Sequence, residues 1–142
     1  IPGPCSLTAA LSICPLLIKN WSFLGFLPSK TSEAETLLKS YLLKPEAIVF
    51  FESPRRILNT LEILEKISDR RLMVVRELTK IFESMYVGSA SEIRDQIADN
   101  LKGEFICIVE SSLKVVLDIE EEKLLEVLLE YHDLSTASKI MI

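Results

Sequence analysis

The sequence has 142 residues, of which 49% are hydrophobic and 26% are charged, so it has the size of one domain and too much apolar content for intrinsic disorder. The formal net charge is −5, and residues 118–142 carry all of it, with two Lys and seven Asp or Glu. A neutral body with an acidic tail lacks the basic stripe that is typical of nucleic-acid-binding proteins, so composition alone argues against an RNA partner.

The chain opens with Ile-Pro-Gly-Pro, without Met and without the basic segment of a signal peptide. Pro2, Gly3 and Pro4 predict a rigid turn that leads into a short apolar helix over residues 6–14, which Pro15 ends. Such openings are typical of a linker between domains. We therefore expect that another domain precedes this one.

Strands and helices alternate along the first 110 residues. Residues 21–26 predict a strand and residues 32–43 a helix, and the continuous apolar run 47–51 is typical of a strand that is covered on both faces. Apolar positions then recur on one face of a helix over residues 57–67. This alternation predicts the α/β class.

Local motifs mark the starts of two helices. Ser53 is a good N-cap, and Pro54 suits the first position of the helix that follows. Ser89 and Glu92 match a capping box for a helix that Gly103 ends. Both motifs predict sharp junctions between a strand and the next helix.

The last strands and the tail complete the pattern. Apolar strands are expected at residues 72–75, 85–87 and 105–109, and Leu-rich amphipathic helices are expected beyond residue 117. We therefore predict an α/β domain over residues 1–112 and a truncated helical appendage over residues 113–142.

The sequence indicates neither a membrane segment nor a metal site. Its longest apolar stretch, residues 7–18, is interrupted by a Ser and a Pro and is shorter than the ~20 residues of a membrane-spanning helix. Cys5, Cys14 and Cys107 form no CxxC pair, which argues against a zinc site and a disulfide framework. We expect reduced thiols in a cytoplasmic protein without a membrane partner.

Polar side chains follow two of the buried strands at their carboxyl ends, where α/β sheets usually bind ligands. If these strands are adjacent, the two clusters form a charged rim at one edge of the sheet. Ordinary surface ion pairs at a helix start and in a solvated turn explain the same residues. The first cluster is Glu52, Ser53, Arg55 and Arg56, and the second is Arg76, Glu77, Thr79 and Lys80.

Five motifs occur in order along the chain. They are IPGPC at 1–5, GFLP at 25–28 followed by Lys30, FESPRR at 51–56, RELTK at 76–80 and KGEF at 102–105. Over residues 1–110 the chain resembles the ribosomal RNA small-subunit methyltransferase I family, within the tetrapyrrole (corrin/porphyrin) methylase superfamily. The resemblance is weaker beyond that point.

The resemblance implies an S-adenosylmethionine-dependent enzyme that methylates the 2′-hydroxyl of a cytidine in small-subunit ribosomal RNA. Such enzymes have two α/β domains with the cofactor in the cleft between them, and they commonly form homodimers. This chain would be the second domain, a mixed sheet flanked by helices. Without the missing N-terminal domain we expect it to be inactive.

The resemblance also implies roles for single residues. Expected cofactor contacts are Cys5, Ser6, Phe51, Ser53, Gly103, Glu104 and Phe105. Glu52, Glu77 and Lys80 are unranked candidates for accepting the proton of the ribose hydroxyl, which is a poor nucleophile. Arg56 and Arg76 are expected to contact RNA, because a guanidinium pairs with phosphate bidentately.

The chain departs from the family pattern at several positions, and other functions stay open. Arg55 stands where the family commonly has His, Ser6 where it has Ala, and the acidic residues 31–35 follow Lys30 where it often has a basic run. One alternative is a methyltransferase for a tetrapyrrole or diphthamide precursor. Another is a non-catalytic domain for dimerisation or RNA docking.

Overall fold

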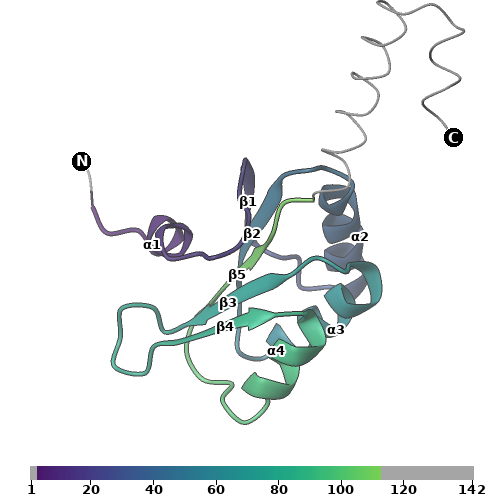
Figure 1. The fold of residues 1–142 in the computed structure, drawn as a ribbon. Coiled ribbons are helices and arrows are strands. Elements are labelled where there is room, and N and C mark those ends of the chain that lie inside the picture. Colours follow the sequence, from purple (N-terminus) through teal and green to yellow (C-terminus); the bar gives the residue numbers. More distant parts are fainter. Residues whose placement is uncertain (1–2, 113–142) are drawn as a thin grey trace, which may run out of the picture. The chain divides into compact units, whose positions relative to one another are not determined.

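The computed structural model describes residues 3–112, and this part of the chain has four helices and five strands (Figure 1). The helices are α1 (Ser6–Ser12), α2 (Thr31–Leu42), α3 (Ile57–Ile67) and α4 (Ala90–Ile97). The strands are β1 (Trp21–Phe26), β2 (Ala47–Glu52), β3 (Leu72–Arg76), β4 (Ser84–Gly88) and β5 (Phe105–Val109). The predicted α/β class is confirmed, and the helices predicted beyond residue 117 lie outside the described residues.

The strands form one mixed sheet in the order β1-β2-β5-β3-β4. β1 and β2 are parallel, and every other neighbouring pair is antiparallel. Because β2 and β3 are both antiparallel to β5, they run in the same direction and end at the same edge. They are not adjacent, since β5, the last of the described strands, lies between them.

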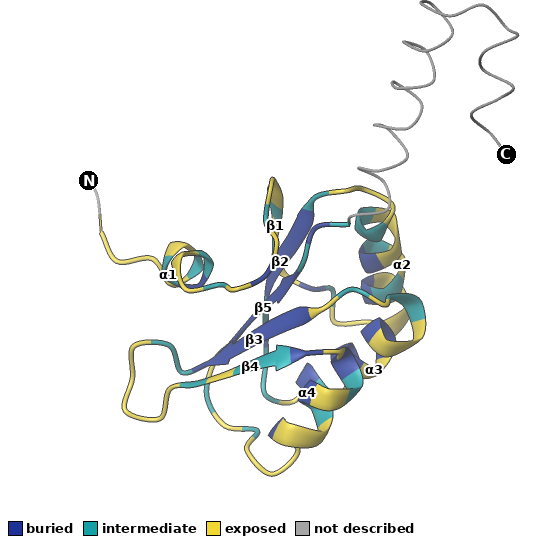
Figure 2. Ribbon diagram, in the orientation of Figure 1, coloured by how far each residue is buried: buried dark blue, intermediate teal, exposed yellow. Residues whose placement is uncertain are grey.

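The two faces of the sheet carry two separate cores. On β3 and β5, Val74 and Cys107 belong to the core under α2, α3 and α4, whereas Met73 and Ile108 belong to a smaller core with Ala10 of α1. This assignment follows the alternation of side chains along a strand. Figure 1 shows α1 on one side of the sheet and the other three helices on the opposite side. Figure 2 shows the central strands as the most buried part of the described chain.

One predicted helix start is confirmed and one is wrong. Ser89 and Glu92 form the reciprocal capping box of α4. The helix after β2 begins at Ile57, and the Ser53 side chain does not cap it. Instead, the carbonyl of Ser53 accepts the N–H groups of Arg56 and Ile57, both at 3.0 Å, which makes a turn before the helix.

Two helices are shorter than predicted. α1 ends at Ser12, and α4 ends at Ile97, although Leu101 beyond it still packs against the larger core. The longest described helix is α2, with 12 residues. None of the helices in residues 3–112 is both long and apolar enough to cross a bilayer.

Candidate functional site

The polar clusters that follow β2 and β3 meet around the first residue of β5. Phe105 is the register partner of Glu52 on one side and of Arg76 on the other. The predicted charged rim is therefore present at one edge of the sheet, with the start of β5 in its middle.

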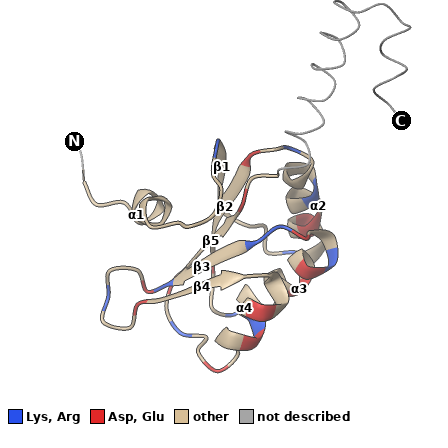
Figure 3. Cartoon of the chain, in the orientation of Figure 1, with Lys and Arg blue, Asp and Glu red and all other residues tan. Residues whose placement is uncertain are grey.

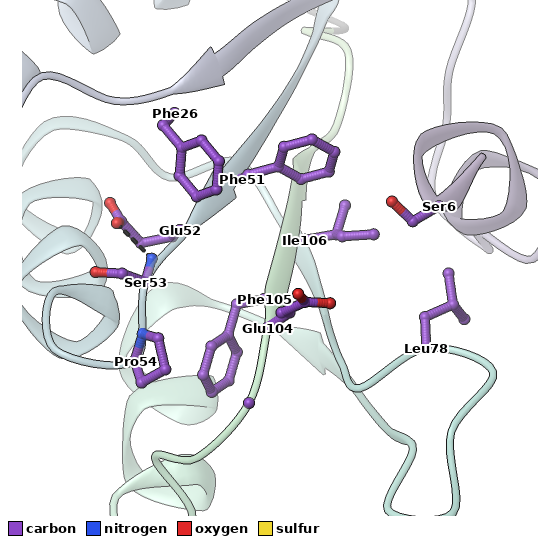
Figure 4. A pocket seen from close by; sticks show the side chains of 11 residues that line it. Ser6, Phe26, Phe51, Glu52, Ser53, Pro54, Leu78, Glu104, Phe105 and Ile106 are labelled. Atoms are coloured by element: carbon purple, nitrogen blue, oxygen red, sulfur yellow. Dashed lines mark hydrogen bonds between the residues drawn. The ribbon is translucent and has the colours of Figure 1, made fainter.

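A pocket of about 450 Å³ lies at this edge, within the range of roughly 300–1,000 Å³ that is usual for small-molecule sites (Figure 4). Its lining residues are Ser6, Phe26, Phe51, Glu52, Ser53, Pro54, Leu78, Gly103, Glu104, Phe105 and Ile106. Six of the seven expected cofactor contacts are among them. The seventh, Cys5, lines a neighbouring hollow between α1 and the loop after β3, which shares Ser6, Leu78 and Glu104 with the pocket.

Aromatic rings form one wall of the pocket. The ring of Phe51 lies 5.0 Å from that of Phe23 and 5.5 Å from that of Phe26, between centroids. In a regular strand, residues three positions apart point to opposite faces. The register of β1 shifts between them, next to Gly25 with its φ of +65°, and this irregularity brings both rings against Phe51. The wall offers an apolar, aromatic surface to a ligand.

Glu52 is a buried carboxylate with donors on both oxygens. Its side chain is 1% exposed. Oε1 accepts the N–H of Ser53 at 2.7 Å and lies 2.8 Å from Nη2 of Arg56, and Oε2 accepts the hydroxyl of Thr60 at 2.9 Å. Since a buried charge is tolerated only when it is paired and hydrogen-bonded, this network fixes the turn after β2 that lines the pocket.

Arg56 joins two loops at the pocket edge. Its Nη1 donates to the carbonyls of Leu27 at 3.0 Å and Pro28 at 3.1 Å, and its Nε donates to Oγ of Ser53 at 3.2 Å. With the ion pair to Glu52, each of its three nitrogens has a partner within the protein. The guanidinium thus ties the segment after β1 to the turn after β2.

Arg76 is 6% exposed at the end of β3. Its Nε donates to the carbonyl of Lys102 at 2.6 Å, and its Nη1 donates to the carbonyl of Phe82 at 3.1 Å. Like Arg56, it holds loops around the pocket together. For both residues the RNA contact stays a prediction.

Glu77, Lys80 and Glu104 form a cluster beside the pocket. Oε1 of Glu77 accepts Nζ of Lys80 at 3.0 Å and the N–H of Glu104 at 2.9 Å, and Nζ of Lys80 also lies 3.0 Å from Oε2 of Glu104. The hydrogen bond from Lys80, followed by that from Glu104, lowers the pKa of Glu77. Hydrogen bonds to Glu77 and then Glu104 raise the pKa of Lys80. Both groups therefore stay charged at neutral pH, which favours a role in orientation.

Some residues of the site escaped the sequence analysis. Phe26, Pro54, Leu78 and Ile106 line the pocket, and each lies inside or next to a motif that carries the family resemblance. Those motifs were the sequence signal from which these four residues could have been predicted. Thr60 had none, because its contact with the Glu52 carboxylate at the end of β2 depends on how α3 packs.

Charge is mixed over the described chain. Figure 3 shows Lys and Arg interspersed with Asp and Glu along the helices and loops. No group of three His, Cys, Asp or Glu side chains within residues 3–112 could hold a metal ion.

The three thiols differ in exposure. Cys5 is exposed, Cys14 is intermediate and Cys107 is buried. Hydrogen bonds at the start of α1, the largest from the backbone of Thr8, lower the pKa of Cys5, whereas burial raises the pKa of Cys107 well above its ordinary value.

A sequence profile of the tetrapyrrole (corrin/porphyrin) methylases matches residues 1–94. The chain belongs to this family. The matched region contains α1, β1 to β4 and the pocket residues up to Leu78, whereas the pocket residues 103–106 follow it in sequence.

Curated relatives agree with the resemblance that the five motifs predicted. The "Ribosomal RNA small subunit methyltransferase I" of Xylella fastidiosa strain 9a5c is 38% identical over 117 residues, which is 79% of this chain and 43% of the relative. The protein of the same name from Thermotoga maritima is 42% identical over 93 residues, which is 65% of this chain and 41% of the relative. The chain thus spans less than half the length of these relatives.

Solved structures support the fold. Cobalt precorrin-4 methyltransferase matches with a TM-score of 0.58 and 14% identity, over 78% of this chain and 50% of that one. Uroporphyrin III C-methyl transferase from Thermus thermophilus matches with a TM-score of 0.52 and 13% identity, over 78% of this chain and 49% of that one. At these identities the likeness concerns the arrangement of helices and strands.

Proposed function

We propose that this chain is the second domain of an enzyme that methylates the 2′-hydroxyl of a cytidine in small-subunit ribosomal RNA, with S-adenosylmethionine as methyl donor. The observation that carries the proposal is the pocket at the sheet edge. Three segments that are far apart in sequence supply six expected cofactor contacts to it: Ser6, residues 51–53 and residues 103–105. The names of the curated relatives favour RNA over a tetrapyrrole as substrate.

The pocket fits part of the cofactor. Phe26 and Phe51 present rings that suit an adenine, and Ser6 and Ser53 add hydroxyl groups at the lining. Both carboxylate oxygens of Glu52 accept from donors within the protein, so Glu52 lines the pocket without an oxygen that is available to a ligand. We therefore expect the proposed N-terminal domain to supply the remaining polar contacts across the cleft.

The contribution of this chain to catalysis is positioning. When bound, S-adenosylmethionine supplies an electrophilic methyl group on a sulfonium. Transfer to a ribose oxygen requires in-line approach, and holding the reacting groups in place can account for much of the acceleration. Glu52 and Arg56 fix the turn that presents Ser53, and Arg76 fixes the loop between β3 and β4 and the segment that leads into β5.

The candidates for the group that accepts the hydroxyl proton stay predictions. Among Glu52, Glu77 and Lys80, each is engaged with protein partners in this chain. Any RNA contact by Arg56 or Arg76 would have to share the guanidinium with the carbonyls that it holds in this chain. We propose that residues 1–112 form the catalytic half-site and residues 113–142 a separate appendage, in a cytoplasmic homodimer.

Titration calorimetry with S-adenosylhomocysteine tests the cofactor half-site. We expect micromolar binding to the chain, and about tenfold weaker binding by Phe26→Ala, since stacking on an aromatic ring is worth about 1–3 kcal/mol. Phe26 is 65% exposed, so the variant should fold. The matched control is Phe82→Ala, which removes a ring that is 70% exposed outside the pocket and should bind normally. No binding by the wild type would support the non-catalytic docking alternative.

A test of the proposed substrate requires the complete gene product that contains this chain. It should make one phosphodiester bond of small-subunit RNA resistant to alkali, because a methylated 2′-oxygen cannot attack the adjacent phosphate. Transfer of a labelled methyl group to a tetrapyrrole, with none to RNA, would overturn the proposed substrate.

A further inference from the structure

We propose that Glu77 is a positioning residue, which fixes the pocket rim at Gly103 and Glu104 and does not take part in proton transfer. Glu77 does not line the pocket, whereas Leu78 beside it and both rim residues do. Its effect on a ligand is therefore indirect. The part of this inference that concerns the cofactor rests on the proposed function.

Two hydrogen bonds connect Glu77 to the rim across 27 residues of sequence. The N–H of Glu77 donates to the carbonyl of Glu104 at 3.0 Å, and Oε1 of Glu77 accepts the N–H of Glu104 at 2.9 Å. The backbone and the side chain of Glu77 thus bind the carbonyl and the N–H of Glu104. Lys80 adds an ion pair to each carboxylate, at 3.0 Å in both cases.

Gly103 is shaped to receive this carboxylate. Its φ is +99°, and a Cβ built at this position would lie 2.4 Å from Cγ and from Oε1 of Glu77. Real Cβ atoms do not approach other atoms so closely, so the absence of a side chain at residue 103 makes room for Glu77. The rim turn and the carboxylate fit each other as a pair.

The backbone around Glu77 is held in a conformation that it would not adopt alone. Glu77 and Thr79 have φ values of +52° and +65°, in the left-handed region that non-glycine residues rarely occupy. Hydrogen bonds compensate for this strain: the N–H of Lys80 donates to the carbonyl of Glu77 at 2.9 Å, and the N–H of Thr79 donates to Oε2 of Glu83. Such strain persists where the surroundings fix it, often near functional sites.

A general base would need an oxygen that faces the ligand and a readily accepted proton. Oε1 of Glu77 already has two donors, from Lys80 and from Glu104, and the residue is absent from the pocket lining. The same contacts are what a clamp between two loops requires. Loss of the clamp should free Leu78 on one loop and Gly103 on the other.

Two substitutions separate positioning from proton transfer. The Glu77→Gln side chain keeps an amide oxygen that can accept the N–H of Glu104, but it cannot act as a base. We expect Glu77→Ala to weaken S-adenosylhomocysteine binding about tenfold and Glu77→Gln to change it less than about threefold. In the complete enzyme, Glu77→Ala should raise KM for the cofactor with little change in kcat, and Glu77→Gln should restore KM. Equal loss of kcat in both variants, with normal cofactor binding, would show a base and overturn the proposal.

Amide exchange measures the clamp without any ligand. We expect the N–H of Glu104 to exchange at least about tenfold faster in Glu77→Ala than in the wild type. Glu33→Ala is the matched control, because this exposed carboxylate of α2 forms its ion pair with Lys30 within its own segment, and its loss should leave this amide unchanged. Unchanged exchange in Glu77→Ala, or the same increase in the control, would overturn the positioning role. If the amide of Glu104 exchanges faster in Glu77→Ala as expected but the wild type does not bind S-adenosylhomocysteine, the result would count against the proposed function alone.

Discussion

Arg56 offers the sharpest test of how the pocket edge is held. Its guanidinium pairs with the carboxylate of Glu52 and donates to the carbonyls of Leu27 and Pro28. The substitution Arg56→Met keeps much of the apolar stem and removes all of these interactions. It therefore asks whether this arginine stabilises the domain or serves a ligand.

The structure sets the size of the effect. Removing one partner of a buried ion pair typically costs about 3–5 kcal/mol. The carboxylate of Glu52 is 1% exposed, but it keeps the donors of Ser53 and Thr60, and the side chain of Arg56 is 28% exposed. We therefore expect the lower end, about 3 kcal/mol of unfolding free energy. For a domain of this size the thermal midpoint should fall by about 12 °C.

Circular dichroism during heating and urea titration measures this loss. Arg55→Met is the matched control, since Arg55 is exposed and its loss should change stability by less than about 0.5 kcal/mol. Arg56→Lys should recover only part of the loss, because an ammonium cannot reach all of these acceptors at once. If Arg56→Met melts like the control but binds RNA more weakly, the guanidinium serves RNA and our structural reasoning is wrong.

Three further predictions concern the rim and the thiols. Gly103→Ala should destabilise the domain by about 1–3 kcal/mol from backbone strain and further through the clash of the new Cβ with Glu77, and urea titration should show only the clash relieved in a Glu77→Ala background. Because the pKa of Glu77 is lowered from about 4.5, the stability that its charged form gives the domain is complete above that pH and is lost as the pH falls through the lowered pKa. The difference in melting point between the wild type and Glu77→Gln should therefore shrink as the pH falls. A constant difference would contradict this. Iodoacetamide should modify Cys5 first and leave Cys107 unmodified until unfolding, as peptide mass mapping can show.

The secondary structure was predictable because its signals are local. The apolar run at residues 47–51 and the capping box at Ser89 depend on neighbours within a few residues, and both predictions are confirmed. The start of α3 was not predictable in the same way. Ser53 and Pro54 match a cap pattern, but the carbonyl of Ser53 closes a separate turn, and its hydroxyl accepts from Arg56.

The membership of the pocket was largely predictable, and the contacts within it were not. Sequence order indicated which residues follow β2 and β3, but it could not show that β5 lies between these strands. Nor could it show the backbone carbonyls that accept from Arg56 and Arg76, which lie between 6 and 29 residues away in sequence. A guanidinium that looks available for phosphate in the sequence is engaged within the fold.

Strand order explains why the turns after β2 and β3 and the start of β5 form one site. Phe105 pairs with Glu52 on one side and with Arg76 on the other, so the turns beyond β2 and β3 lie on either side of the start of β5. The networks of Glu52 and Glu77 then hold those turns by side-chain contacts. If this account is correct, substitutions that loosen one turn should leave the hydrogen-bond ladder of β5 intact and change the pocket on that side alone.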